Sequence, residues 1–220
     1  MMPTRFPTLL VMGALLMSAA MLSGCNAIGA IAYKTAGPPP VYAEYKPLPR
    51  ATLVFADANE AGTASFSDAD ALARFVERQL ADRRVCPLVP SEKALDLRGS
   101  NPNFGKWSVA EIGRKVGAEQ VIYIDVTETR VSQVIGSRTQ RAFASAKVRV
   151  IDASSGALLW PMESQQGYPV QFETPMTSLD DRLTPTEVRN AGLFGLADKI
   201  GKLFYDWKPG EDSDTRPEDE

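Results

Sequence analysis

Histidine is missing from this chain, and cysteine occurs only twice in its 220 residues. Without histidine, neither a Ser-His-Asp nor a Cys-His catalytic arrangement can form, and a zinc site would lack its commonest nitrogen ligand. We therefore predict no catalytic residues, no metal site and no cofactor. One cysteine, Cys25, has a separate role described below, which leaves Cys86 without a disulfide partner in the chain.

Cys86 lies in the short apolar stretch "VCPLV", which predicts a strand. Free cysteine is among the most buried residue types, so we expect Cys86 in the core. An unpaired cysteine in an exported protein can instead be a reactive thiol or form a bridge to another molecule.

An excess of basic residues is also missing, because 24 Lys and Arg face 27 Asp and Glu, for a net charge of −3. This balance argues against nucleic acid as a partner. Much of the acid lies in the final stretch "GEDSDTRPEDE", and a charged segment with few apolar residues is typical of disorder. We predict a disordered acidic tail over residues 208–220.

No apolar run is long enough to span a membrane comfortably. The longest, "LLVMGALLMSAAML" from Leu9 to Leu22, falls short of the roughly 20 apolar residues that a spanning helix needs. Arg5 precedes this run, and the small residues Ser23 and Gly24 follow it. This pattern predicts a secretory signal peptide over residues 1–24.

The sequence "LSGC" at the end of that region resembles the lipobox of bacterial lipoproteins. In that family the cysteine carries a diacylglycerol and, as the new amino terminus, an acyl chain. The resemblance implies that Cys25 is the lipidation site and that these covalent lipids bind the membrane. Asn26 in place of Asp implies, in the best-known sorting scheme, an outer-membrane location facing the periplasm. The alternative is an ordinary signal peptide followed by a chance cysteine.

A proline-rich tether is predicted over residues 25–50. Its prolines are incompatible with a helix or a central strand, and such a segment extends by about 3.1 Å per residue. It could be a stalk that holds the domain towards a partner, or a plain tether with Tyr42 and Tyr45 packed on the domain. The prolines are Pro38, Pro39, Pro40, Pro47 and Pro49.

Strand and helix signals alternate over residues 51–207. Apolar runs at 51–58 and 121–126 predict buried strands. Capping pairs predict three helix starts: Ser67 with Asp70, Ser108 with Glu111, and Thr184 with Glu187. The inward residues are expected to be Leu72, Phe75, Val76, Leu80, Val109, Ile112, Val116, Val188, Leu196, Ile200 and Leu203, and on one strand Ala144, Ala146, Val148 and Val150. We predict a single α/β domain with a mixed sheet, in the order β-α-β-α-β-β-β-α, with the helices packed on the sheet.

The stretch "KVRVIDASSGALLW", with the entry "VGAEQVIYIDV", resembles one periplasmic α/β fold. It is shared by the curli-secretion lipoprotein, the amino-terminal domain of the Tol-Pal translocation protein and the lipoprotein activators of penicillin-binding proteins. In this chain, the positions of the turn and strand motif of that fold are occupied by Asp152, Gly156, Leu159 and Trp160. The chain also resembles uncharacterised bacterial lipoproteins with a "GPPP" stalk and a "W-P…G-Y-P-V…E-T-P" stretch. Neither resemblance implies an activity.

Some residues invite a functional interpretation. Tyr168 and Phe172 could line a groove for glycan or peptide, or could cover the sheet edge. Arg138 and Arg141 lie near a predicted hairpin and could meet an acidic surface, although charged residues often mark the solvent face of a strand. We take these four as the candidate interaction surface. Asp125, Glu128 and Asp152 could be imagined as acid/base groups, but nothing places two of them together. The glycines Gly192, Gly195 and Gly201 indicate close helix packing rather than a phosphate loop.

Three functions remain open. The first is a non-catalytic interaction or accessory module of the cell envelope that binds an envelope protein. The second is a subunit of an outer-membrane secretion or export assembly. The third is a protein or enzyme that acts on envelope glycans or peptides. The lipid anchor, the stalk and the lack of catalytic residues favour the first.

Overall fold

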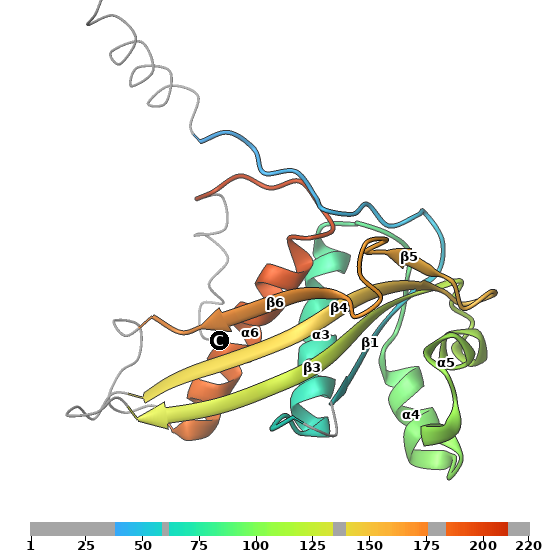
Figure 1. Cartoon of the computed structure of the whole chain (residues 1–220), viewed down its shortest axis with the longest axis horizontal. Coiled ribbons are helices and arrows are strands. Elements are labelled where there is room, and N and C mark those ends of the chain that lie inside the picture. The colour runs from blue at the N-terminus through green and yellow to red at the C-terminus, as the bar shows by residue number, and fades with distance from the viewer. Residues whose placement is uncertain (1–37, 59–61, 134–139, 176–183, 211–220) are drawn as a thin grey trace, which may run out of the picture. The chain divides into compact units, whose positions relative to one another are not determined.

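A computed structural model of the chain describes residues 38–58, 62–133, 140–175 and 184–210 (Figure 1). Its contacts divide the chain into two units. Tyr42–Asp206 forms the α/β body, and in the other unit Val41 and Trp207 form an antiparallel bridge. The predicted signal peptide, Cys25 and the tail beyond residue 210 lie outside the described residues. In the described ranges, no helix is both long and apolar enough to cross a membrane.

The body has a mixed α/β architecture, which confirms the predicted fold class. Its elements are β1 (Thr52–Ala58), α3 (Phe66–Asp82), β2 (Leu88–Val89), α4 (Glu92–Ser100), the 3-10 helix η1 (Phe104–Lys106), α5 (Val109–Val116), β3 (Gln120–Gln133), β4 (Gln140–Asp152), β5 (Leu158–Trp160), β6 (Tyr168–Glu173) and α6 (Pro185–Gly201). The sequence analysis missed α4 and β6. Only Ala94 of α4 is fully buried, so this helix lacks a clear apolar stripe. Strand β6 contains Pro169, which is tolerated at a sheet edge.

The strands form one sheet in the order β2-β1-β3-β4-β5, and β6 also pairs with β4. Strand β1 runs parallel to β2 and β3, whereas β3 and β4 form a long antiparallel hairpin. The pairing of β1 with β3 ends at Ala58 and Val126, and the hairpin extends past that point (Figure 1).

The two faces of the sheet differ in how they are covered. Helices α3 and α6 lie side by side behind one face (Figure 1). The side chains of β4 that alternate towards them are buried as predicted: Ala144, Ala146, Val148 and Val150. On the other face, α4, η1 and α5 cover one end and form a second core with Leu53, Phe55 and Val121. Among the described elements, no helix covers the rest of this face, which we call the open sheet face.

Two of the predicted helix starts are confirmed. Ser108 and Glu111 form a capping box at α5, and Thr184 and Glu187 form one at α6. Each serine or threonine oxygen accepts the backbone N–H of the glutamate, whose carboxylate accepts the backbone N–H of the cap. Helix α5 ends at Gly117 in the left-handed region, with φ 83°, as expected for a glycine stop.

The third predicted start is wrong by two residues. Helix α3 is capped by Ser65 and Asp68, not by Ser67 and Asp70. Asp70 instead lies 2.8 Å from the guanidinium of Arg98. Both serine pairs fit the capping pattern, so only the tertiary contacts of the two aspartates decide between them.

Glycines bring α6 close to the sheet. A Cβ atom at Gly192 would lie 2.7 Å from Cβ of Ala142 on β4, and one at Gly195 would overlap the ring of Phe172 on β6. Both distances are too short for real side chains. Close packing therefore accounts for these glycines, as predicted.

Cys86 is half-buried and precedes β2, which comprises only Leu88 and Val89. The expectation of a core residue on a strand is therefore wrong. The chain turns at Arg84, which has a φ of 50°, and reaches the sheet only at Leu88. Burial raises the pKa of the Cys86 thiol, against a weaker opposite effect of a hydrogen bond with Thr52, so the thiolate is disfavoured at neutral pH.

The last part of the predicted tether contacts the body. The Tyr45 ring lies 6.0 Å from that of Trp160, and its backbone N–H donates to Leu203 O. Lys46 pairs with Asp206 at 2.7 Å. Tyr42, by contrast, is 72% exposed. We call Tyr42–Arg50 the strap.

Candidate interaction surfaces

The structure does not gather the four predicted surface residues in one place. Arg138 lies outside the described residues. Arg141 lies on the open sheet face, 2.8 Å from Glu173. Tyr168 and Phe172 lie on the opposite face and pack against the core, where Tyr168 stacks on Trp160 at 5.1 Å. These two aromatic side chains cover the sheet, and the groove interpretation finds no support from their position.

The open sheet face presents side chains from several strands in register. Asp57 of β1, Asp125 of β3 and Lys147 of β4 form one row across it, and Tyr123 with Arg149 forms the next. A bulge in β3 between Val126 and Glu128 shifts the register further along. The other described side chains of this face include Thr127, Glu128, Arg130, Ser132, Arg141, Phe143, Ser145, Pro169, Gln171 and Glu173.

Arginines on this face are held over aromatic rings. The Arg130 guanidinium lies 4.5 Å from the ring centre of Phe143, and that of Arg149 lies 5.0 Å from Tyr123. Arg130 also pairs with Glu128 at 2.7 Å. Because these contacts restrict long side chains in advance, binding a partner here would cost less conformational entropy.

Tyr123 stays protonated at physiological pH. Burial raises the pKa of its hydroxyl to about 12, and the carboxylates of Asp125 and Asp57 add to the rise. The hydroxyl therefore acts as a neutral donor or acceptor rather than as a base.

Asp57 was not identified in the sequence analysis, although it ends the first predicted strand. Burial raises the pKa of its carboxyl, Arg98 opposes the rise, and Asp125 and Asp70 add to it. Arg98 is itself held 2.8 Å from Asp70 and 3.7 Å from Asp57. This group ties α4 to β1 and α3, which is a structural role.

Of the carboxylates considered for acid/base work, Asp125 and Glu128 both lie on the open sheet face, and Asp152 lies apart from them. Asp125 is opposite Lys147, whereas Asp152 pairs with Gln120 at the far end of the hairpin. Hydrogen bonds from Ser154 and Ser155 hold the pKa of Asp152 far below its usual range. In the described part of the chain, no three His, Cys, Asp or Glu side chains are grouped to hold a metal ion.

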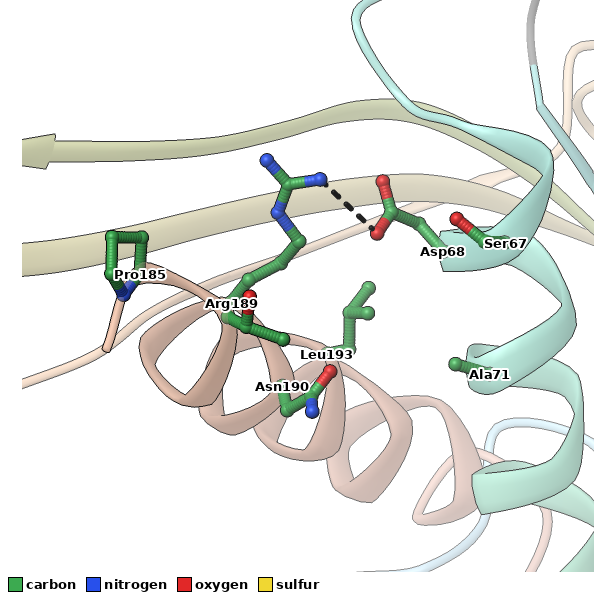
Figure 2. A pocket seen from close by; sticks show the side chains of 8 residues that line it. Ser67, Asp68, Ala71, Pro185, Arg189, Asn190 and Leu193 are labelled. Carbon is green, nitrogen blue, oxygen red and sulfur yellow. Dashed lines mark ion pairs between the residues drawn. The ribbon is translucent and has the colours of Figure 1, made fainter. Parts of the chain in front are cut away.

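A pocket of about 390 Å³ lies between the first turns of α3 and α6 (Figure 2). Asp68 and Arg189 face each other across it, 3.7 Å apart. The Asp68 side chain is 6% exposed and that of Arg189 is 45% exposed. The lining residues are Ser67, Asp68, Ala71, Pro185, Thr186, Arg189, Asn190 and Leu193. The sequence analysis missed this pocket because it depends on the packing of two distant helices.

Asp68 is held as a carboxylate. One oxygen, Oδ2, accepts hydrogen bonds from the Ser65 backbone N–H at 3.1 Å and from Thr129 Oγ1 at 2.8 Å. Burial alone raises the pKa of Asp68, but these hydrogen bonds and the charge of Arg189 outweigh burial and lower it overall. Because the pKa of Asp68 is lower in the folded state than the unfolded value of about 3.9, the carboxylate stabilises the fold at pH values above that unfolded pKa. This stabilisation is lost as the pH falls through the folded-state pKa.

Asp68→Asn should lower the free energy of unfolding at pH 7 by about 1–3 kcal/mol, because a charge-assisted hydrogen bond is replaced by a neutral one. The difference from the wild type should shrink below about pH 4. Urea unfolding followed by circular dichroism across this pH range measures both effects. Asp82→Asn, at the exposed end of the same helix, should follow the wild-type profile. A deficit for Asp68→Asn that is equal at pH 7 and pH 3 would contradict the assignment.

Comparisons with known proteins give structural likeness alone. No protein-family model matches the chain, and no curated protein matches it. It is similar to lipoprotein GNA1162 from Neisseria meningitidis, with 18% identity, a TM-score of 0.44 and coverage of 69% of this chain and 94% of that one. It is similar to the PelC dodecamer subunit from Paraburkholderia phytofirmans, with 14% identity, a TM-score of 0.40 and coverage of 77% and 94%.

The LpoB C-terminal domain from Salmonella enterica is also similar, with 16% identity, a TM-score of 0.35 and coverage of 60% of this chain and 87% of that one. The similar structures thus include lipoproteins. At identities of 14–18% and TM-scores of 0.35–0.44, the likeness carries no inference about the activity, partner or location of this chain.

Proposed function

We propose that this chain is a lipid-anchored accessory protein of the cell envelope, attached through Cys25 to the outer membrane and facing the periplasm. It acts by binding an envelope protein and not by catalysis. The secretion or export assembly stays an alternative prediction, and so does the binding or modification of envelope glycans or peptides.

The open sheet face is the observation that carries this proposal. Arg130 and Arg149 are positioned over Phe143 and Tyr123, and arginine and tyrosine are enriched among the residues that dominate binding energy at protein interfaces. The face carries both signs of charge, with Arg141, Lys147 and Arg149 on β4 between acidic residues of β3 and β6. Such a pattern suits recognition of one complementary surface. The chain also has no histidine, the side chain most often used for general acid-base catalysis.

Crosslinking in native membranes tests the proposal. A photoactivatable benzophenone side chain at position 171, on the open sheet face, should give an adduct with an envelope protein. Arg130→Glu and Arg141→Glu should each weaken this adduct about tenfold, since reversing a charge at an interface turns attraction into repulsion.

Lys93→Glu, on the exposed surface of α4, is the matched control and should leave the adduct unchanged. Equal yields in all three variants would show that the open sheet face does not bind the partner. Turnover of peptidoglycan or another envelope substrate by the purified full chain would replace the proposal with an enzymatic one.

A further inference from the structure

Helices α3 and α6 run parallel, with both first turns at the pocket of Figure 2. At their other ends, Gln79 donates a hydrogen bond to Asp198 and lies against Gly201. Residues four apart lie on the same side of a helix. The stripe of α3 that lines the pocket with Ser67 and Ala71 therefore continues to Phe75, and that of α6 continues from Asn190 to Phe194.

The pocket contains the guanidinium of Arg189, whose side chain is 45% exposed. Asp68 attracts Arg189 at 3.7 Å, which is beyond hydrogen-bond distance. Within the described residues, no hydrogen bond uses the N–H groups of Arg189. A guanidinium with five N–H donors in a fixed fork matches a carboxylate. Asn190, Thr186 and Ser67 add polar groups around it.

An exposed aromatic ring lies one helical turn from this guanidinium. Phe194 is 58% exposed, and its ring meets that of Phe75 edge-on at 5.8 Å. A large apolar side chain that is half exposed, packs on a second ring and is surrounded by polar groups is typical of a docking surface.

The unpaired charge beside this pair is positive. Arg74 and Arg78 extend the pocket-lining stripe of α3 and are exposed. Neither side chain makes an ion pair with another described residue. Two nearby carboxylates are engaged, because Asp198 pairs with Lys202 at 2.8 Å and Asp70 pairs with Arg98 at 2.8 Å. The charge of this surface is therefore complementary to an acidic partner.

We infer that the pocket, the Phe75–Phe194 pair and the two arginines form one docking site, which we call the α3/α6 site. Its occupant is an acidic, partly apolar segment of a protein partner. A carboxylate of that segment binds Arg189 in the pocket, and an apolar side chain covers Phe194. This inference rests on the proposed function, since it names the chemistry of a partner, but it concerns a different surface from the open sheet face.

A benzophenone side chain at position 190 of the full chain, in native membranes, tests the α3/α6 site. Mass spectrometry should identify a crosslinked segment that is rich in Asp or Glu and contains apolar residues. Arg189→Gln and Phe194→Ser should each reduce the adduct by about tenfold to a hundredfold, the range expected for one charge-assisted hydrogen bond or one buried ring.

The chain offers matched controls for both substitutions. Phe66 is 59% exposed and Arg84, in the turn after α3, is also exposed, so Phe66→Ser and Arg84→Gln alter similar side chains outside the site. These variants should leave the adduct at position 190 unchanged, and circular dichroism of all four variants confirms folding.

Several outcomes would overturn the inference. They are an adduct with a second copy of this chain, with lipid or with a basic segment, equal losses in the site and control variants, or no adduct at position 190. If position 171 still crosslinks to an envelope protein, only the α3/α6 site is wrong. If neither position crosslinks, the proposed function fails with it.

Discussion

Cys25→Ala should abolish fatty-acid attachment and release the chain from the membrane fraction. The sulfur of Cys25 is the only atom that the lipobox resemblance offers for a diacylglycerol, and alanine has no nucleophilic side chain. Each buried CH₂ contributes about 0.8 kcal/mol, so two or more chains give stable attachment. Metabolic labelling with an alkyne fatty acid, followed by membrane fractionation, measures both effects.

Cys86→Ala provides the matched control, because it removes the other cysteine of the chain. It should keep both the label and the membrane location. Labelling that persists in Cys25→Ala and disappears in Cys86→Ala would show that the lipid is attached to Cys86, which would contradict the proposal. Labelling of neither wild type nor variant would support an ordinary signal peptide.

Because the strap packs on the rest of the body, only part of the proline-rich segment can be deleted to test whether its length positions the body. Because Tyr45 and Lys46 contact the body, a deletion from Gly37 to Pro49 would remove packing and stalk length together. A deletion that ends before Val41 keeps the bridge between Val41 and Trp207 and shortens the stalk alone. Loss of partner crosslinking in the shorter deletion would show that the stalk positions the body, whereas loss in the longer one could come from instability.

The parts of the fold that depend on local sequence could be predicted. The capping boxes of α5 and α6 and the glycine stop at Gly117 follow from side-chain bonds within a few residues. The alternation of Ala144, Ala146, Val148 and Val150 followed from the period of a strand with one covered face. Helix α3 was found but started two residues late, since Asp68 is selected by Thr129, which is distant in sequence.

The candidate sites depend on contacts between residues that are far apart in the sequence, and local sequence patterns do not predict such contacts. Asp57 and Asp125 become neighbours only through the register of β1 with β3. Tyr168 and Phe172 looked available because β6 was not foreseen, yet α6 packs on Phe172 and Tyr168 stacks on Trp160. Arg189 became a candidate only when α6 was placed beside α3. Sequence patterns predicted the buried face of the elements that they identified, but not which polar faces meet.

Trp160 joins the strap, the sheet and the segment that follows the last helix. It is 9% exposed, and its ring lies 6.0 Å from Tyr45, 5.1 Å from Tyr168 and 6.1 Å from Phe204. It also pairs with Val150 of β4. These contacts connect the strap, β4, β6 and the segment after α6, so a cavity here would weaken all of them.

Trp160→Ala should therefore lower the free energy of unfolding by about 3–5 kcal/mol, the usual cost of replacing a buried tryptophan by alanine. That is a large fraction of the roughly 5–15 kcal/mol that stabilises a domain. Thermal and urea unfolding measure the loss, and trypsin cleavage after Arg50 should accelerate because Tyr45 loses its ring contact.

Trp160→Phe should retain much of the stability, and Met162→Ala, at a neighbouring residue that is 74% exposed, should change little. A Trp160→Ala chain with wild-type stability and an equally resistant strap would show that Trp160 does not join these segments.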